Sequence, residues 1–261
     1  MTQESAGLKD QTAAEPSQGS LRGRVALVTG GSGGIGRAIA GTLSAAGMPV
    51  AISYGSNSGP AVSLAAEITA TGGRAITVAS DLSRAEAPAE LVAEVEDALG
   101  PVDVLVSNAG LGQSKPLEQV SASDFDEMIA VNLRAPFLLA QRVLPRMSDR
   151  KFGRILFMSS VAAFTGGIVG PHYAASKAGL HGLTHFLASR FAADGVTVNA
   201  LAPALITGTG MLPGEPEELA RRIPVGRLGT PGDVAGMALA MLRNAYLTNQ
   251  VISIDGGMYP R

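Results

Sequence analysis

The sequence contains no cysteine, and this absence excludes several kinds of chemistry at once. Without cysteine the chain has no disulfide, no thiol nucleophile and no thiolate metal site. Histidine is scarce as well: only His172, His181 and His185 occur, and their spacing does not match the HExxH metal motif. We therefore expect no metal site.

Charged side chains are also few. They make up 16% of the 261 residues, against about 25% in average globular proteins, while apolar residues make up 46%. Acidic and basic residues are interspersed and the formal net charge is −2, so no basic face is available for a nucleic acid backbone. The apolar excess predicts a large core or a buried subunit interface.

The sequence offers no targeting or membrane signal. Residues 1–20 lack the basic start and apolar stretch of a secretory signal, so we expect a flexible tail there and a single domain over residues 21–261. Two segments without charged side chains, 155–176 and 195–214, are broken by glycine and proline, which argues against membrane spans. A cytoplasmic protein is the expectation.

Short apolar runs alternate with longer helical patterns from residue 21 onward. Runs that are apolar throughout are typical of parallel strands covered on both faces. The alternation predicts an α/β fold, a Rossmann-type doubly wound parallel sheet of seven strands with helices on both faces; a TIM barrel would also alternate, but the glycine-rich first turn favours the open sheet. The predicted strands are 25–29, 49–53, 75–80, 102–107, 154–159, 196–201 and 250–254, and the predicted helices are 35–46, 64–71, 89–99, 123–147, 173–193 and 232–242.

The turn after the first strand, TGGSGGIG, has the spacing TGxxxGxG from Thr29 to Gly36. Glycines there permit a tight turn, bring backbone N–H groups close to a pyrophosphate and aim a helix N-terminus at it. Because a glycine pattern alone is weak, a plain strand-to-helix turn is the alternative. The dinucleotide contacts predicted for this turn are Gly30, Ser32, Gly33, Gly34, Ile35 and Gly36.

Later strand ends carry small or polar residues at the same edge of the predicted sheet. Asp81, before Leu82, can accept a hydrogen bond from an adenine amino group, or it can simply cap a helix. The sequence Asn108-Ala109-Gly110 lets the chain lie against a ribose, or forms a simple turn. We expect all five residues to contact the dinucleotide.

The second strand end, ISYGSNSG, bears on cofactor choice. Enzymes that prefer NAD usually have Asp or Glu there to hold the ribose 2′-hydroxyl, and none occurs between Gly36 and Glu67. NADP(H) is therefore the preferred cofactor, with NAD(H) possible. The residues expected near the 2′ position are Tyr54, Ser56, Asn57 and Arg37, which is either the cation for the phosphate or a solvated helix residue.

The stretch YAASK puts Tyr173 and Lys177 on one helix face, four residues apart. A nearby ammonium stabilises a phenolate, so we expect the pKa of Tyr173 to fall from about 10 toward working pH, which suits a general acid or base. Ser160 ends the fifth strand within reach of the same substrate oxygen, and Asn132 is a polar residue amid apolar helix positions. For Tyr173 and Lys177 alone, a surface helical pair is the commoner explanation.

In their order and spacing these segments resemble the classical short-chain dehydrogenase/reductase family over residues 21–261, and within it the 3-oxoacyl-[acyl-carrier-protein] reductase-like members. The resemblance implies a homotetramer or dimer and a catalytic tetrad of Asn132, Ser160, Tyr173 and Lys177. Tyr173 would protonate a carbonyl oxygen that Ser160 orients, as hydride arrives from the nicotinamide. The resemblance also implies nicotinamide contacts from Pro203, Ile206 and Thr207.

We therefore expect an NADP(H)-dependent reduction of a small-molecule ketone to a secondary alcohol. Substrate contacts are expected from Ser160, Ala162, His172 and Tyr173, under a lid formed by residues 205–217. NAD-dependent oxidation of a sugar or polyol, and a non-catalytic dinucleotide sensor or scaffold, are the alternatives. Asp194 stands where carrier-protein-dependent members often have Arg, and an acid there disfavours an acidic carrier protein.

Overall fold

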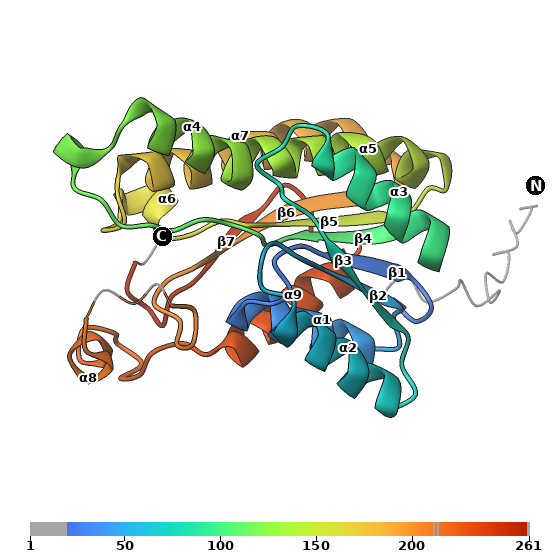
Figure 1. Ribbon diagram of the computed structural model, residues 1–261, viewed down its shortest axis with the longest axis horizontal. Helices are drawn as coiled ribbons and strands as arrows, with labels where there is room; N and C mark the ends of the chain where they lie inside the picture. Colours follow the sequence, from blue (N-terminus) through green and yellow to red (C-terminus); the bar gives the residue numbers. More distant parts are fainter. Residues whose placement is uncertain (1–19, 211, 213, 260–261) are drawn as a thin grey trace, which may run out of the picture.

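A computed structural model describes residues 20–210, 212 and 214–259, which include one parallel sheet; the predicted tail, residues 1–19, lies outside them. The seven strands lie in the order β3-β2-β1-β4-β5-β6-β7 (Figure 1). The chain thus runs outward from β1 to β3, returns beside β1, and then runs outward again to β7, which confirms the predicted doubly wound sheet. The strands are β1 (Val25–Val28), β2 (Val50–Tyr54), β3 (Ala75–Ala79), β4 (Val102–Ser107), β5 (Gly153–Met158), β6 (Val196–Pro203) and β7 (Val251–Ile254).

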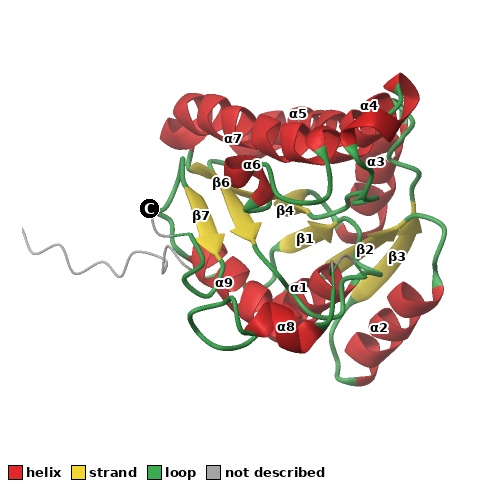
Figure 2. Ribbon diagram, turned by 90° about the vertical axis from the view of Figure 1, so that its left-hand side faces the viewer, coloured by secondary structure: helices red, strands yellow, loops and turns green. Residues whose placement is uncertain are grey.

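Helices cover both faces of the sheet (Figures 1 and 2). One layer contains α3, α5 and α7, with the shorter α4 and α6 beside them, and the other contains α1, α2 and α9. The helices are α1 (Gly34–Ala45), α2 (Gly59–Ala70), α3 (Ala87–Leu99), α4 (Ala122–Ile129), α5 (Ala135–Asp149), α6 (Ala162–Thr165), α7 (Pro171–Phe191), α8 (Pro216–Ala220) and α9 (Pro231–Arg243).

The core explains why the strands are apolar throughout. Along β1, Val25 and Leu27 pack with the α3, α5 and α7 layer, whereas Ala26 and Val28 pack with the α1 and α9 layer. Successive residues of β1 therefore face opposite hydrophobic layers, and neither face of the strand meets water.

The predicted helix 123–147 is interrupted. It consists of α4, one π-helical turn (Ala130–Arg134) and α5. Asn132 lies in that turn with none of its surface exposed. Such turns hold an extra residue and often occur at functional sites. The sequence predicted one continuous helix because apolar spacing does not show where the backbone hydrogen-bond pattern changes.

Two findings concern only the described part of the chain. None of its helices is long and apolar enough to cross a membrane. Within residues 20–210, 212 and 214–259, no three acidic or histidine side chains are grouped closely enough to hold a metal ion.

Candidate active site

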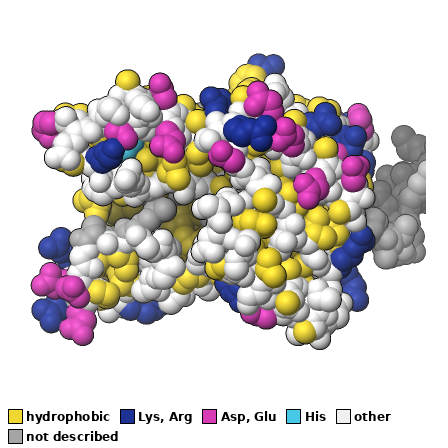
Figure 3. Space-filling model, viewed as in Figure 1, with side chains coloured by type: hydrophobic (Ala, Val, Ile, Leu, Met, Phe, Trp, Pro, Cys, Tyr) yellow, Lys and Arg dark blue, Asp and Glu magenta, His cyan; other side chains and the backbone are white. Residues whose placement is uncertain are grey.

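A cavity of about 690 Å³ opens at the edge of the sheet where its strands end. Figure 3 shows it as a hollow lined in part by hydrophobic side chains, between the α6 side and the α8 side of the molecule. The glycine-rich turn after β1, the ends of β4, β5 and β6, and the first turns of α7 contribute to its wall. Doubly wound sheets bind ligands at this edge, next to the point where the strand order reverses.

The glycine-rich turn is shaped by contacts that leave no space for side chains. Gly30 has φ +64°, a left-handed backbone conformation that favours glycine. A Cβ at Gly36 would overlap the carbonyl oxygen of Gly30 and lie 2.6 Å from Asn108 Nδ2. Asn108 Nδ2 in turn donates to the carbonyl oxygens of Thr29 and Gly30, at 3.0 and 3.1 Å. The turn after β1 is thus fixed against the end of β4.

All the dinucleotide contacts predicted for this turn and for the β4 end line the cavity. Ala109 meets the turn through its backbone N–H, which donates to Thr29 Oγ1 at 3.0 Å. The structure brings together nine of the predicted dinucleotide contacts, Gly30, Ser32, Gly33, Gly34, Ile35, Gly36, Asn108, Ala109 and Gly110.

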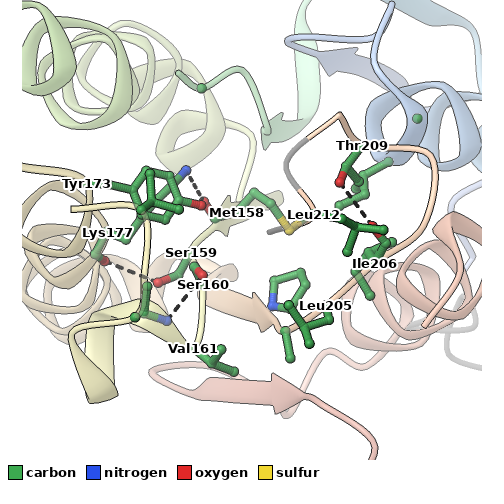
Figure 4. Close-up of a pocket in the computed structure, with 18 of the residues that line it drawn as sticks. Met158, Ser159, Ser160, Val161, Tyr173, Lys177, Leu205, Ile206, Thr209 and Leu212 are labelled. Atoms are coloured by element: carbon green, nitrogen blue, oxygen red, sulfur yellow. Dashed lines mark hydrogen bonds between the residues drawn. The ribbon is translucent and has the colours of Figure 1, made fainter. Parts of the chain in front are cut away.

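Tyr173, Lys177 and Ser160 lie together on one side of the cavity (Figure 4). Tyr173 is 8% exposed and Lys177 4%. Lys177 Nζ lies 5.7 Å from the centroid of the Tyr173 ring and donates to the carbonyl oxygen of Met158 at 2.9 Å. The side chains of Tyr173 and Ser160 are hydrogen-bonded. The spacing of YAASK thus gives a buried pair instead of a surface pair.

Asn132 reaches this group from behind the β4 end and does not form part of the cavity wall within the described residues. Its Oδ1 accepts from the N–H of Leu111 at 2.8 Å, and its Nδ2 donates to the Leu111 carbonyl at 3.0 Å and to Ser176 Oγ at 3.1 Å. A Cβ at Gly110 would stand 3.2 Å from both Asn132 Oδ1 and Lys177 Nζ. Because glycine has no side chain, Gly110 leaves room for the Asn132 amide and the Lys177 ammonium on the same side of the β4 end.

Burial dominates the ionisation of both YAASK side chains. It raises the pKa of Tyr173 above its ordinary value of 10.0, and the hydrogen bond with Ser160 opposes this rise only in part. Burial also lowers the pKa of Lys177 from 10.5 to about 8. The predicted fall in the pKa of Tyr173 is therefore wrong, because desolvation raises this pKa and the Lys177 ammonium donates to the Met158 carbonyl. The phenol keeps its proton near neutral pH.

The structure places Arg37 in an ion pair with Glu67, away from the cavity. Arg37 Nη2 lies 2.7 Å from both Glu67 carboxylate oxygens, and Nη1 donates to the Pro60 carbonyl at 2.7 Å. The same contact lowers the pKa of Glu67, whose carboxylate also accepts from Ser63 Oγ at 2.9 Å. The positive charge of Arg37, which was expected to bind a cofactor phosphate, is thus neutralised by Glu67 of α2.

Several other predicted residues lie outside the cavity wall as far as the described residues define it. Asp81 Oδ1 accepts from the backbone N–H and hydroxyl of Ser83, at 3.0 and 2.7 Å, as a local turn cap does. Thr207 donates its N–H to Gly229 at 2.9 Å. His172 is 1% exposed, and its Nδ1 has no hydrogen-bond partner within the described residues. The remaining members of this group are Tyr54, Ser56, Asn57 and the buried Leu82.

The far wall of the cavity was only partly predicted. Pro203 and Ile206 line the cavity as expected, as does Ala162 on the Tyr173 side, and Thr209 lines it where Thr207 was predicted. Figure 4 shows Leu205, Ile206, Thr209 and Leu212 across the cavity from Tyr173. The sequence analysis missed four lining residues, because no strand-end motif indicates them: Leu219 in α8, Arg222 just after it, and Met258 and Tyr259 near the end of the described chain.

Comparisons with known proteins agree with this geometry. The family model described as short chain dehydrogenase matches residues 24–219. The chain is similar to the 3-oxoacyl-[acyl-carrier-protein] reductase of Synechocystis sp., with 39% identity over 92% of this chain and 98% of that protein. It is similar to the acetoacetyl-CoA reductase of Shinella zoogloeoides, with 42% identity over 90% and 98% of the two chains.

A solved structure with a similar fold is the blue fluorescent protein from a metagenomic library in complex with NADPH. Its TM-score is 0.86 at 38% identity, and the match covers 92% of this chain and all of that one (100%). The match extends over nearly the whole of both chains, so the shared fold includes the sheet edge that carries the cavity. The chain therefore belongs to the short-chain dehydrogenase family of NAD(P)-dependent oxidoreductases.

Proposed function

We propose that this enzyme reduces a ketone to a secondary alcohol with NADPH. The observation that carries the proposal is the group formed by the buried side chains of Tyr173 and Lys177 and the half-buried Ser160, which faces the same cavity as the glycine-rich turn after β1. The names of the relatives support it, since two are reductases of 3-oxoacyl or acetoacetyl thioesters and one structural neighbour holds NADPH.

The residues around the cavity fit a nicotinamide dinucleotide. Backbone N–H groups of the turn from Gly30 to Gly36, at the N-terminus of α1, would hold its pyrophosphate, and Asn108 to Gly110 would lie against a ribose. Pro203, Ile206 and the neighbouring Thr209 would border the nicotinamide. When bound, the reduced cofactor supplies hydride to the carbonyl carbon.

The protein side chains would supply the proton. Tyr173 holds its proton near neutral pH because burial raises its pKa, so it can donate to the carbonyl oxygen. Ser160 orients that oxygen by a second hydrogen bond. Lys177, whose pKa is about 8, remains largely protonated near pH 7, and its charge stabilises the tyrosinate that proton transfer leaves behind. Asn132 fixes the β4 end against α7 through Leu111 and Ser176.

The preference for NADP(H) rests on the second strand end. Tyr54, Ser56 and Asn57 leave it without an acid that would repel a 2′-phosphate. We propose that Ser56 and Asn57, which are exposed there, take part in holding the phosphate, that Asp81 and Leu82 border the adenine, and that Arg37 contributes only when Glu67 releases it.

The test is a coupled measurement of cofactor and substrate. Purified enzyme is assayed for oxidation of NADPH and NADH with acetoacetyl thioesters and simple ketones, and for the reverse reaction with a panel of sugars and polyols. We expect NADPH-dependent ketone reduction to give the higher kcat/KM. A preference for NAD-dependent polyol oxidation, or tight cofactor binding with no turnover of any carbonyl compound, contradicts the proposal.

We also propose that the chain assembles into a homotetramer or a dimer through its long helices. Phe125, Phe137 and Phe186 are 41%, 41% and 58% exposed, on α4, α5 and α7, although they are large apolar side chains. Light scattering of the purified protein tests this proposal. A monomer at micromolar concentration contradicts it.

A further inference from the structure

The cavity wall carries two cationic side chains, and no acidic one among the described residues. Lys177 belongs to the reacting centre. Arg222, which follows α8, is an exposed residue that lines the cavity from the other side. Several arginines elsewhere are neutralised, for example Arg37 by Glu67 and Arg227 by Asp233. In the described part of the chain, no acid forms an ion pair with Arg222.

The cavity wall near Arg222 is apolar. Leu212, Leu219 and Met258 form an apolar cluster that lines the same part of the cavity. A charge beside low-dielectric walls acts more strongly than one on an open surface, and a cleft lined by one sign of charge concentrates ligands of the opposite sign. The planar guanidinium also matches carboxylate and phosphate oxygens in a bidentate geometry.

We propose that Arg222 is a specificity-determining residue, which binds an anionic group on the ketone substrate while Tyr173 and Ser160 hold its carbonyl oxygen. The proposal rests on the proposed function. The substrate class is thus a ketone that carries a carboxylate or a phosphate, with the anion directed toward α8. Neutral ketones would be accepted as weaker substrates.

The chain offers a matched control. Arg221 precedes Arg222, is also exposed and also forms no ion pair within the described residues, but it does not line the cavity. The test compares R222Q with R221Q in the full-length protein with NADPH. Two substrate pairs separate the possible anions: acetoacetate against its methyl ester, and acetoacetyl-CoA against the uncharged acetoacetyl-N-acetylcysteamine thioester.

We expect R222Q to raise the KM of the anionic member by about threefold to tenfold, as loss of a partly solvent-screened ion pair does. Its kcat, and the KM of the neutral member, stay within about twofold, and R221Q behaves as wild type. A response confined to acetoacetate identifies a carboxylate, and one confined to acetoacetyl-CoA identifies a phosphate.

Three results would overturn the proposal. In the first, R222Q changes the KM of the neutral and anionic members equally. In the second, R222Q weakens NADPH binding in a fluorescence titration, which assigns the arginine to the cofactor. In the third, R222Q leaves every kinetic parameter unchanged. Failure of the proposed function looks different, because wild type would then reduce none of the four compounds with either cofactor, and the present proposal would fall with it.

Discussion

Replacing Lys177 by Met should stabilise the protein while abolishing most of its activity. The buried ammonium has a pKa of about 8 in place of 10.5, and at about 1.36 kcal/mol per pH unit this difference amounts to roughly 3 kcal/mol of destabilisation when Lys177 is charged. The substitution also removes the hydrogen bond to the Met158 carbonyl, at a cost of about 1 kcal/mol. K177M should therefore be more stable than wild type by about 2 kcal/mol near pH 7.

The sign of the pH dependence follows from proton linkage. Between pH 8 and 10.5 the unfolded chain binds the Lys177 proton and the folded chain has lost it, so the stability of wild type, relative to K177M, rises with pH in this window. The penalty is complete below pH 8 and vanishes above 10.5. By about pH 10 the advantage of K177M should have fallen to about zero.

Urea unfolding followed by far-UV circular dichroism measures both values, and circular dichroism suits a chain without tryptophan. K151M is the control, because the Lys151 side chain is 67% exposed and its ion pair with Asp194 contributes about 1 kcal/mol or less. A K177M protein that is no more stable than wild type near pH 7, or whose advantage does not change with pH, refutes the reasoning about burial.

Two further changes test other contacts. Substituting Glu67 by Gln should release Arg37 from its ion pair and increase the preference for NADPH over NADH by about threefold, measured as the ratio of their KM values; an unchanged ratio shows that Arg37 does not reach the cofactor phosphate. Substituting Thr230 by Ala removes the capping box that Thr230 and Asp233 form at the start of α9 and should cost about 1 kcal/mol in urea unfolding, without a change in KM; a loss well below this value contradicts the importance of the cap.

The strands were predictable because the inner ones are buried on both faces, and an apolar composition alone carries that signal. The run 102–107 coincides with β4, and the other predicted strands differ from the observed ones by one or two residues at their ends. The short α8 was missed, since five residues hold too little periodicity. The π-helical turn at Asn132 was missed because the apolar spacing does not show where the backbone hydrogen-bond pattern changes; the bonds of the Asn132 side chain with Leu111, 21 residues away, were not visible either.

The site was predictable where a motif holds its residues at fixed spacing, as in the turn after β1 and in YAASK. The site was not predictable where a contact between distant residues determines the ionisation or the partner of a side chain. The pKa of Tyr173 depends on burial and on the hydrogen bond with Ser160, and neither is visible in the sequence. In the same way, the ion pair of Arg37 on α1 with Glu67 on α2 joins residues 30 positions apart, which the sequence does not reveal.

The central claim is that the Tyr173 phenol delivers the proton in ketone reduction. The most direct test is kcat of Tyr173→Phe with NADPH, alongside cofactor affinity by fluorescence titration and stability in urea. Removing one hydroxyl from a general acid should lower kcat by roughly a hundredfold or more, while NADPH affinity and stability stay near those of wild type. Undiminished turnover in that variant contradicts the account.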